Sequence, residues 1–111
     1  MCMSDYAIKN LKEVEDSAAD LGVSYFRYAP GFKAPFGHRH REQEEAYVVV
    51  SGSGHVRLDD EEIEVRQWDV VRVAPQVGRA FHAGPDGLEL IAIGNDRPEG
   101  GDGEFIPDFW N

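Results

Sequence analysis

The feature that most constrains the fold is a series of short apolar runs separated by turn residues, from Val23 to Gly94. The clearest run, residues 45–50 (EAYVVV), is rich in β-branched side chains, which favour strands. Residues 55–58 and 61–65 alternate apolar and polar side chains, as a strand with one buried face does. Further strands are predicted at residues 23–30, 69–73, 79–82 and 88–94. Such a series, with a strand about every ten residues and no long helix, predicts an all-β sandwich or barrel.

The stretches between and around these runs define the organisation of the chain. Turns are predicted where glycine, proline, serine and aspartate gather, at residues 51–54 (SGSG), 59–60, 74–78 (APQVG) and 84–87 (GPDG). We assign residues 1–22 to an N-terminal segment, in which apolar residues at roughly helical spacing allow a short helix that Gly22 would end. Residues 23–94 are expected to form the sandwich or barrel. Residues 95–111 begin as a glycine-rich linker and end in Phe105, Ile106, Phe109 and Trp110, so this tail is expected to dock on the barrel or on a second subunit.

Length and charge narrow the possible partners. The chain has 111 residues, which suits one domain, and 11 basic against 21 acidic residues give a net charge of −10. Such a chain repels phosphate backbones and anionic lipids, so neither nucleic acid nor a membrane is an expected partner. The single cysteine, Cys2, excludes a disulfide framework and a cysteine-based zinc finger. With no signal peptide and no apolar run near the roughly 18 residues of a membrane span, a cytoplasmic protein is expected.

The pair His38 and His40 is the first candidate for chemistry. Residues two apart on a strand point to the same face, so both imidazoles can reach one cation, and a nearby carboxylate can supply a third ligand. Nitrogen and carboxylate donors suit zinc, iron, manganese, nickel or copper, and a set with open positions is typical of catalytic sites. The alternative is that His-x-His is only a solvated polar strand edge.

The surrounding residues, GFKAPFGHRHREQEEAYVVVSGSG, resemble the first motif of the cupin superfamily. In that motif, His-x-His is followed by three or four residues, a glutamate, six residues and a glycine. Here four residues separate His40 from Glu45, and six separate Glu45 from Gly52, whereas the upstream Gly31 lies one residue further away than usual. The resemblance implies a double-stranded β-helix (jelly-roll) barrel with His38, His40 and Glu45 as metal ligands inside it. The neighbouring Glu44 lacks the right distance to Gly52.

The stretch QWDVVRVAPQVGRAFH matches the second cupin motif only in part. Asp69 matches the aspartate of that motif, but Trp68 stands where glycine is usual. Arg79 falls on the position of the fourth ligand, and arginine cannot bind a cation because it only donates hydrogen bonds. His82 is the nearby imidazole, and strand alternation places it on the face opposite to Arg79 unless a bulge resets the register. His82 therefore stays a candidate fourth ligand, with a rim or surface histidine as the alternative.

Two interpretations of the cavity follow. In the first, a divalent transition metal binds His38, His40 and Glu45, and Arg79 orients an anionic substrate beside it. In the second there is no metal, and Arg79 pairs with Glu45 or binds an anion directly. Tyr47 shares the face of Glu45 and is expected in the ligand cavity or its wall.

The resemblance therefore implies a small single-domain cupin that binds a small, anionic molecule. Its activity would be that of an oxygenase or isomerase, or it would be a non-catalytic sensor, and the residues assign no catalytic group. A small barrel with an apolar tail is also expected to form a homodimer.

Overall fold

Seven strands and no helix make up the part of the chain that the computed structural model describes, residues 21–95 and 101–111. The strands are β1 (Leu21–Tyr28), β2 (Gly37–His40), β3 (Glu45–Leu58), β4 (Glu61–Arg66), β5 (Val70–Val73), β6 (Arg79–Asn95) and β7 (Gly103–Ile106). The helix expected within residues 1–22 lies outside the described residues, except that Leu21 and Gly22 already belong to β1. No described helix is long and apolar enough to cross a membrane.

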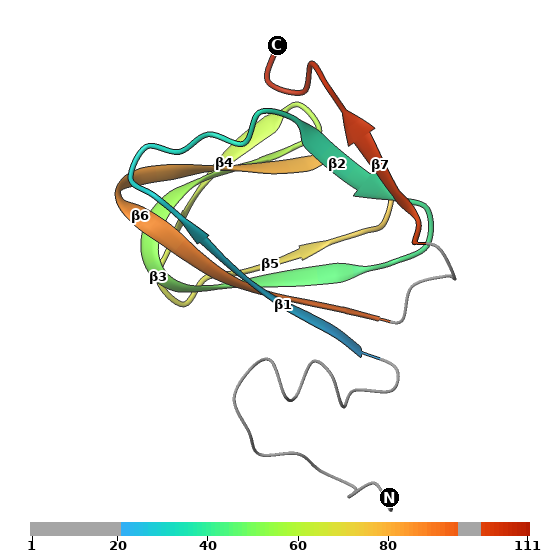
Figure 1. The fold of residues 1–111 in the computed structure, drawn as a ribbon, viewed down its shortest axis with the longest axis horizontal. Coiled ribbons are helices and arrows are strands. Elements are labelled where there is room, and N and C mark those ends of the chain that lie inside the picture. The colour runs from blue at the N-terminus through green and yellow to red at the C-terminus, as the bar shows by residue number, and fades with distance from the viewer. Residues whose placement is uncertain (1–20, 96–100) are drawn as a thin grey trace, which may run out of the picture.

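The strands form one antiparallel sheet that curls into a barrel (Figure 1). Its hydrogen-bonded order is β4-β3-β6-β2-β7, with β1 added to β6 and β5 added to β3. The two long strands, β3 and β6, pair from Glu45 with Gly94 to Leu58 with Arg79 and so run through the whole barrel. The prediction of an all-β, double-stranded β-helix is confirmed by this arrangement.

The core lies between the inward faces of these curved strands. Tyr47, Val49 and Val56 of β3 point inward and are buried, as are Leu88 and Leu90 of β6. The remaining core residues are Val65, Val73, Phe81, Ala83 and Ala92. Between the irregularities of both strands, buried and more exposed residues alternate, which places every second side chain of these stretches inside the barrel.

Two predicted turns are wrong. Residues 51–54 belong to β3 and residues 84–87 belong to β6, and at these places both strands bend and their pairing register shifts. Gly52 and Gly87 have φ values of 81° and 80°, which favour glycine, and a Cβ at Gly52 would overlap the carbonyl of Gly87. The glycines thus mark a bulge and a close approach of two backbones, not a reversal of the chain.

The C-terminal residues lie against the barrel. Strand β7 pairs with β2, opposite His38 and His40, at the edge of the sheet. Phe109 is buried, and the indole nitrogen of Trp110 donates a hydrogen bond of 2.7 Å to the carbonyl of Ala34. Phe105, in contrast, is 74% exposed although it contacts Phe36 edge to face. This segment therefore closes the end of the barrel that carries the histidines.

Candidate functional site

His38, His40 and Glu45 come together at one end of the barrel. One potential ligand atom from each lies within 4.8 Å of those from the other two. Strand β2 projects both imidazoles from the same face, and the chain then turns through residues 41–44 so that β3 begins with Glu45. His40 Nε2 lies 3.1 Å from Glu45 Oε1, and His38 Nε2 lies 3.8 Å from the same oxygen. Two nitrogens and a carboxylate therefore converge on a common point.

The neighbouring acid, Glu44, takes no part in this cluster. Its side chain is 49% exposed and forms an ion pair with Arg72 of the adjoining strand β5. Its backbone amide donates to the side-chain oxygen of Asn95, which fixes the start of β3. Because adjacent residues of a strand point to opposite faces, Glu44 faces outward and Glu45 faces the barrel.

The carboxylate of Glu45 is held in its ionised form. Burial alone would raise its pKa, but the contact with the His38 imidazole, the hydrogen bond from Tyr47 and the charges of His40 and Arg79 outweigh this and lower the pKa to about 2. The Tyr47 hydroxyl donates to Glu45 Oε1 over 2.6 Å. Burial, followed by the Glu45 charge, raises the pKa of Tyr47, so this hydroxyl keeps its proton and acts as a donor. At neutral pH the site therefore combines an ionised carboxylate, Glu45, with a hydroxyl that donates a hydrogen bond, Tyr47.

Arg79 lies beside His38 and is fully buried. The two residues face each other across β2 and β6, so their side chains share one face. The two terminal guanidinium nitrogens reach the carbonyls of Ala74 and Pro75 at 3.2 and 3.5 Å. Its Nε is buried and has no hydrogen-bond partner among the described residues. Within residues 21–95 and 101–111, no ion pair within 4 Å joins Arg79 to Glu45, although the Arg79 charge still lowers the pKa of Glu45.

A small cavity of about 90 Å³ connects these groups. Its polar wall consists of His38, Glu45, Tyr47 and Arg79, and its apolar wall of Phe26, Tyr28, Ala34, Phe36, Ala80 and Phe81. The aromatic rings of Tyr47 and Phe81 meet at 5.0 Å between centroids and close the inner end. The cavity thus offers one cluster of ligand atoms, one cation and an aromatic wall.

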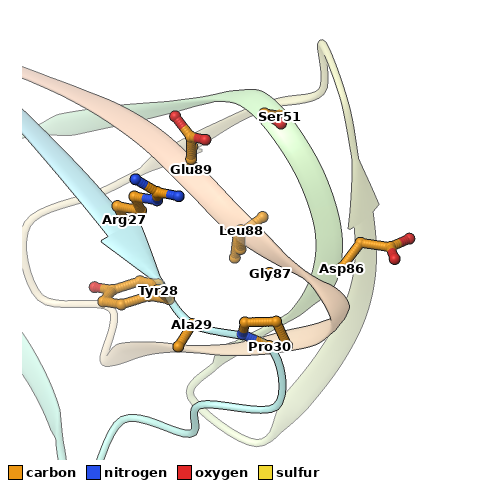
Figure 2. Close-up of a pocket in the computed structure, with 9 residues that line it drawn as sticks. All are labelled: Arg27, Tyr28, Ala29, Pro30, Ser51, Asp86, Gly87, Leu88 and Glu89. Atoms are coloured by element: carbon orange, nitrogen blue, oxygen red, sulfur yellow. The ribbon is translucent and has the colours of Figure 1, made fainter.

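A larger hollow of about 490 Å³ lies at the bend of β6, next to the end of β1 (Figure 2). Arg27, Asp86 and Glu89 carry its charges, and Tyr28, Pro30 and Leu88 belong to its wall. None of the candidate metal ligands lines it. Size alone would select this hollow, but the convergence of titratable groups selects the smaller cavity.

His82 does not join the cluster. It lies on the face of β6 opposite to Arg79 and Phe81, where it pairs with His55 of β3. Its ring contacts Trp110 at 6.2 Å between centroids, and its backbone forms a bridge with Lys33. These contacts agree with the alternative interpretation, in which His82 is a histidine at the rim of the barrel.

The sequence analysis missed Asp102. This aspartate lies just before β7, its side chain is fully buried, and its Oδ1 is 2.9 Å from His40 Nδ1. Its Oδ2 accepts hydrogen bonds of 2.7 and 2.8 Å from the backbone amides of Glu42 and Gln43. In a chain with 21 acids, nothing in the local sequence GGDGE distinguishes this carboxylate from the exposed ones.

Comparison with known proteins agrees with this geometry. Residues 24–94 match the family model described as the cupin domain. No curated protein matches the chain significantly. A cupin protein from Bacteroides fragilis superposes with a TM-score of 0.74 at 28% identity, covering 85% of this chain and 86% of that one.

Two further structures share the fold at lower identity. A conserved protein with a double-stranded β-helix domain from Klebsiella pneumoniae gives a TM-score of 0.67 at 19% identity, over 78% of this chain and 75% of that one. A PAC13 variant from Streptomyces, solved with uridine, gives 0.67 at 17% identity, over 78% and 68%. The family match spans β1 to β6, including both histidines and Glu45, and the chain therefore belongs to the cupin domain family.

Proposed function

We propose that this protein is a metal-dependent cupin that binds a small anionic molecule in the cavity lined by Glu45 and Arg79. The observation that carries the proposal is the convergence of His38, His40 and Glu45 within 4.8 Å, beside a cavity that His38 and Glu45 line together with a buried guanidinium. In this assignment the three residues hold a divalent transition metal, with zinc, iron, manganese, nickel and copper as candidates. Arg79 and Tyr47 contact the bound molecule.

The donor set fits such a metal. Glu45 is ionised at neutral pH because its pKa is about 2, and imidazole nitrogen with carboxylate oxygen is a common set for these ions. The His40 Nε2 and Glu45 Oε1 atoms, 3.1 Å apart, would both be ligand atoms. Three protein ligands leave coordination positions open. A metal bound there would supply Lewis acidity or redox chemistry toward a molecule in the cavity.

The guanidinium of Arg79 supplies charge complementarity to an anion. Its Nε has no partner among the described residues, and a buried donor without a partner costs on the order of 1–3 kcal/mol. A carboxylate or phosphate oxygen at that position would satisfy the donor through a charge-assisted hydrogen bond. The cavity volume of about 90 Å³ restricts the ligand to a small molecule or to the acidic end of a larger one.

Two reaction classes suit such a site. An oxygenase would use the open metal positions, and an isomerase would use a substrate polarised by the metal, with Tyr47 as a hydrogen-bond donor to it. We assign no catalytic residue, because either reaction requires a substrate pose.

Elemental analysis of protein purified without added metal tests the metal site. We expect close to one transition metal per chain, and loss of that metal in His38→Ala. His55→Ala is the matched control, since His55 lies on the outer face of β3 and should leave the metal content unchanged. Absence of metal from the wild type, even after incubation with each candidate ion, would contradict the proposal.

A second function is a metal-free binding protein or sensor. It is favoured by a specific observation: Glu45 Oε1 already accepts a hydrogen bond from Tyr47, and a proton shared with His40 Nε2, 3.1 Å away, could take the place of a metal ion as its second partner. Thermal shifts with small dicarboxylates and sugar phosphates, measured with and without chelator, separate the two functions. Stabilisation that survives chelation and disappears in Arg79→Met supports the sensor, whereas stabilisation that requires metal supports the first proposal.

We also propose that the protein is a cytoplasmic homodimer. Exposed apolar residues on strands β1, β6 and β5 of the same sheet support the dimer: Tyr25 is 44% exposed, Ile93 39% and Val70 61%. Such residues normally mark a contact surface when they gather in one area. Sedimentation equilibrium would report the dimer mass, and a monomer at all concentrations would contradict this part of the proposal.

A further inference from the structure

Asp102 joins the C-terminal segment to the candidate metal ligands. Its carboxylate is fully buried and contacts three groups of the β2–β3 region: His40 Nδ1 and the backbone amides of Glu42 and Gln43. The position of this carboxylate is therefore fixed on both oxygens. Glu45 meets the other nitrogen of the same imidazole.

We propose that Asp102 is a positioning residue for the metal centre, which keeps the Nδ1 proton of His40 directed at its own carboxylate and so presents the Nε2 lone pair to the metal. The inference rests on the metal-binding function proposed above, since it explains how one of the three ligands is prepared.

The hydrogen-bond chemistry of the imidazole gives the first step. A carboxylate only accepts hydrogen bonds, so the 2.9 Å contact requires a proton on His40 Nδ1. In the neutral ring the proton can sit on one nitrogen only, so Nε2 then carries the lone pair. That lone pair points at Glu45 Oε1, 3.1 Å away, which is also an acceptor when ionised. Two acceptors facing each other require a cation or a proton between them.

The surroundings of Asp102 explain why it stays an acceptor. Its Oδ2 accepts two backbone amide hydrogen bonds, at 2.7 and 2.8 Å from Glu42 and Gln43, and hydrogen bonds of this kind favour the ionised carboxylate. The same two amides belong to the turn that connects the histidines to Glu45. Asp102 therefore fixes both the turn and the ring. When a carboxylate that holds a metal-bound histidine in this way is mutated, the affinity for the metal typically falls by roughly 10–100-fold.

The variant Asp102→Asn separates the two roles of the carboxylate. Its amide oxygen can still accept from Glu42 and Gln43, so the turn retains its backbone hydrogen bonds. Its amide nitrogen then faces His40 Nδ1 as a donor, which favours the ring with its proton on Nε2. In that form Nε2 can donate to Glu45 but cannot bind a metal.

Two measurements on the whole 111-residue chain test the inference. The first is competition titration with Zn²⁺ and Co²⁺, in which Asp102→Asn should bind each ion about 10–100-fold more weakly than wild type. Asp69→Asn is the matched control, because Asp69 also accepts a backbone amide, from Arg66, and has no contact with the histidines. It should bind both ions as wild type does.

The second measurement is ¹⁵N NMR of the His40 ring in the metal-free proteins, which reports which nitrogen is protonated. Wild type should carry a proton on Nδ1, and Asp102→Asn should lose it. Asp102→Asn should also unfold within a few degrees of wild type in the metal-free state, whereas Asp102→Ala, which loses the turn contacts too, should unfold earlier.

The outcomes distinguish this inference from the proposed function. Weaker binding with an altered Nδ1 signal in Asp102→Asn supports the positioning role. Equal affinity in a wild type and a variant that both bind metal overturns it, although the metal site itself stands. If wild type binds no metal, the proposed function fails and the positioning role falls with it. If both proteins bind metal, an unchanged Nδ1 proton in Asp102→Asn overturns the positioning role even where the affinity of the variant is lower.

Discussion

Phe109 packs directly against Gly37, the residue before His38, so that a methyl group added at position 37 would overlap the phenylalanine ring. The same ring lies against Gly78, where an added Cβ would come within 2.8 Å of it. Gly37 immediately precedes His38, and Gly78 immediately precedes Arg79, so both glycines adjoin a residue of the candidate site. The ring of Phe109 thus covers the backbone next to both site residues, where only glycine leaves room for it.

The first prediction concerns this contact. Gly37→Ala should lower the free energy of unfolding by about 1–3 kcal/mol, the usual cost of overpacking, because neither the strand nor the ring has room to move. Gly22→Ala is the matched control, since a Cβ there meets only an ordinary contact at 3.5 Å. Urea unfolding gives both values. In Gly37→Ala/Phe109→Ala the cost should be less than the sum of the two single costs, and full additivity would contradict the contact.

The second prediction concerns Trp68, which stands where the family motif usually has glycine. Its φ is 71°, a left-handed conformation that is unfavourable for a bulky residue, and its side chain is 68% exposed. Trp68→Gly should therefore raise the free energy of unfolding by about 1 kcal/mol, because relief of the strain exceeds the small loss of packing. The neighbouring Gln67→Gly should instead destabilise the protein, and a lower midpoint for Trp68→Gly in urea would refute this account.

The third prediction is a loss of stability in acid. The folded pKa of Glu45, about 2, lies below its ordinary value of 4.5, so its ionised form stabilises the fold fully above pH 4.5. This stability should be lost as the pH falls from about 4.5 to about 2, and Asp102, whose pKa is also lowered, should add to the loss.

Chemical unfolding across this pH range provides the measurement. Glu45→Gln should flatten the dependence on pH, whereas Glu104→Gln, at an exposed acid of β7, should leave it unchanged. Equal slopes for wild type and Glu45→Gln would show that Glu45 is not held in its ionised form.

The fourth prediction concerns the hydrogen bond from Tyr47 to Glu45. Tyr47→Phe removes a donor 2.6 Å from an ionised, partly buried carboxylate, so it should cost about 1.5–3 kcal/mol at neutral pH. It should also raise the pKa of Glu45 toward 4.5 and shift acid unfolding to higher pH. Tyr28→Phe, at another tyrosine of the same cavity, is the control and should cost less than about 0.5 kcal/mol. In a Glu45→Gln background, the effect of Tyr47→Phe should be smaller.

The part of the site that lies within one short stretch could be predicted from sequence. His38, His40 and Glu45 span eight residues, and the spacing to Gly52 in the cupin motif was enough to choose Glu45 over Glu44. The β-rich pattern also predicted the barrel, because periodicity along a strand is a local property.

Features that depend on distant parts of the chain could not be predicted. Asp102 is separated from His40 by about sixty residues, and only the pairing of β7 with β2 brings it there. The glycines at 51–54 and 84–87 indicated turns because glycine permits reversals and bulges equally. The partner strand decides whether a reversal or a bulge forms, and the local residues do not specify that partner.

The long pairing of β3 with β6 has a consequence for how the chain folds. Residues 79–95 pair with residues 45–58 and also with residues 21–28, so the central strand bonds to segments up to about seventy positions earlier in the chain. Barrels built from such distant contacts fold slowly, in roughly milliseconds to seconds. The chain must first lose the entropy of closing long loops, and only then does strand pairing lower its free energy. On the ribosome, the histidines would emerge well before the strand that carries Arg79 and before Asp102. The cavity is therefore completed only after β6 has paired with β3 and β7 with β2.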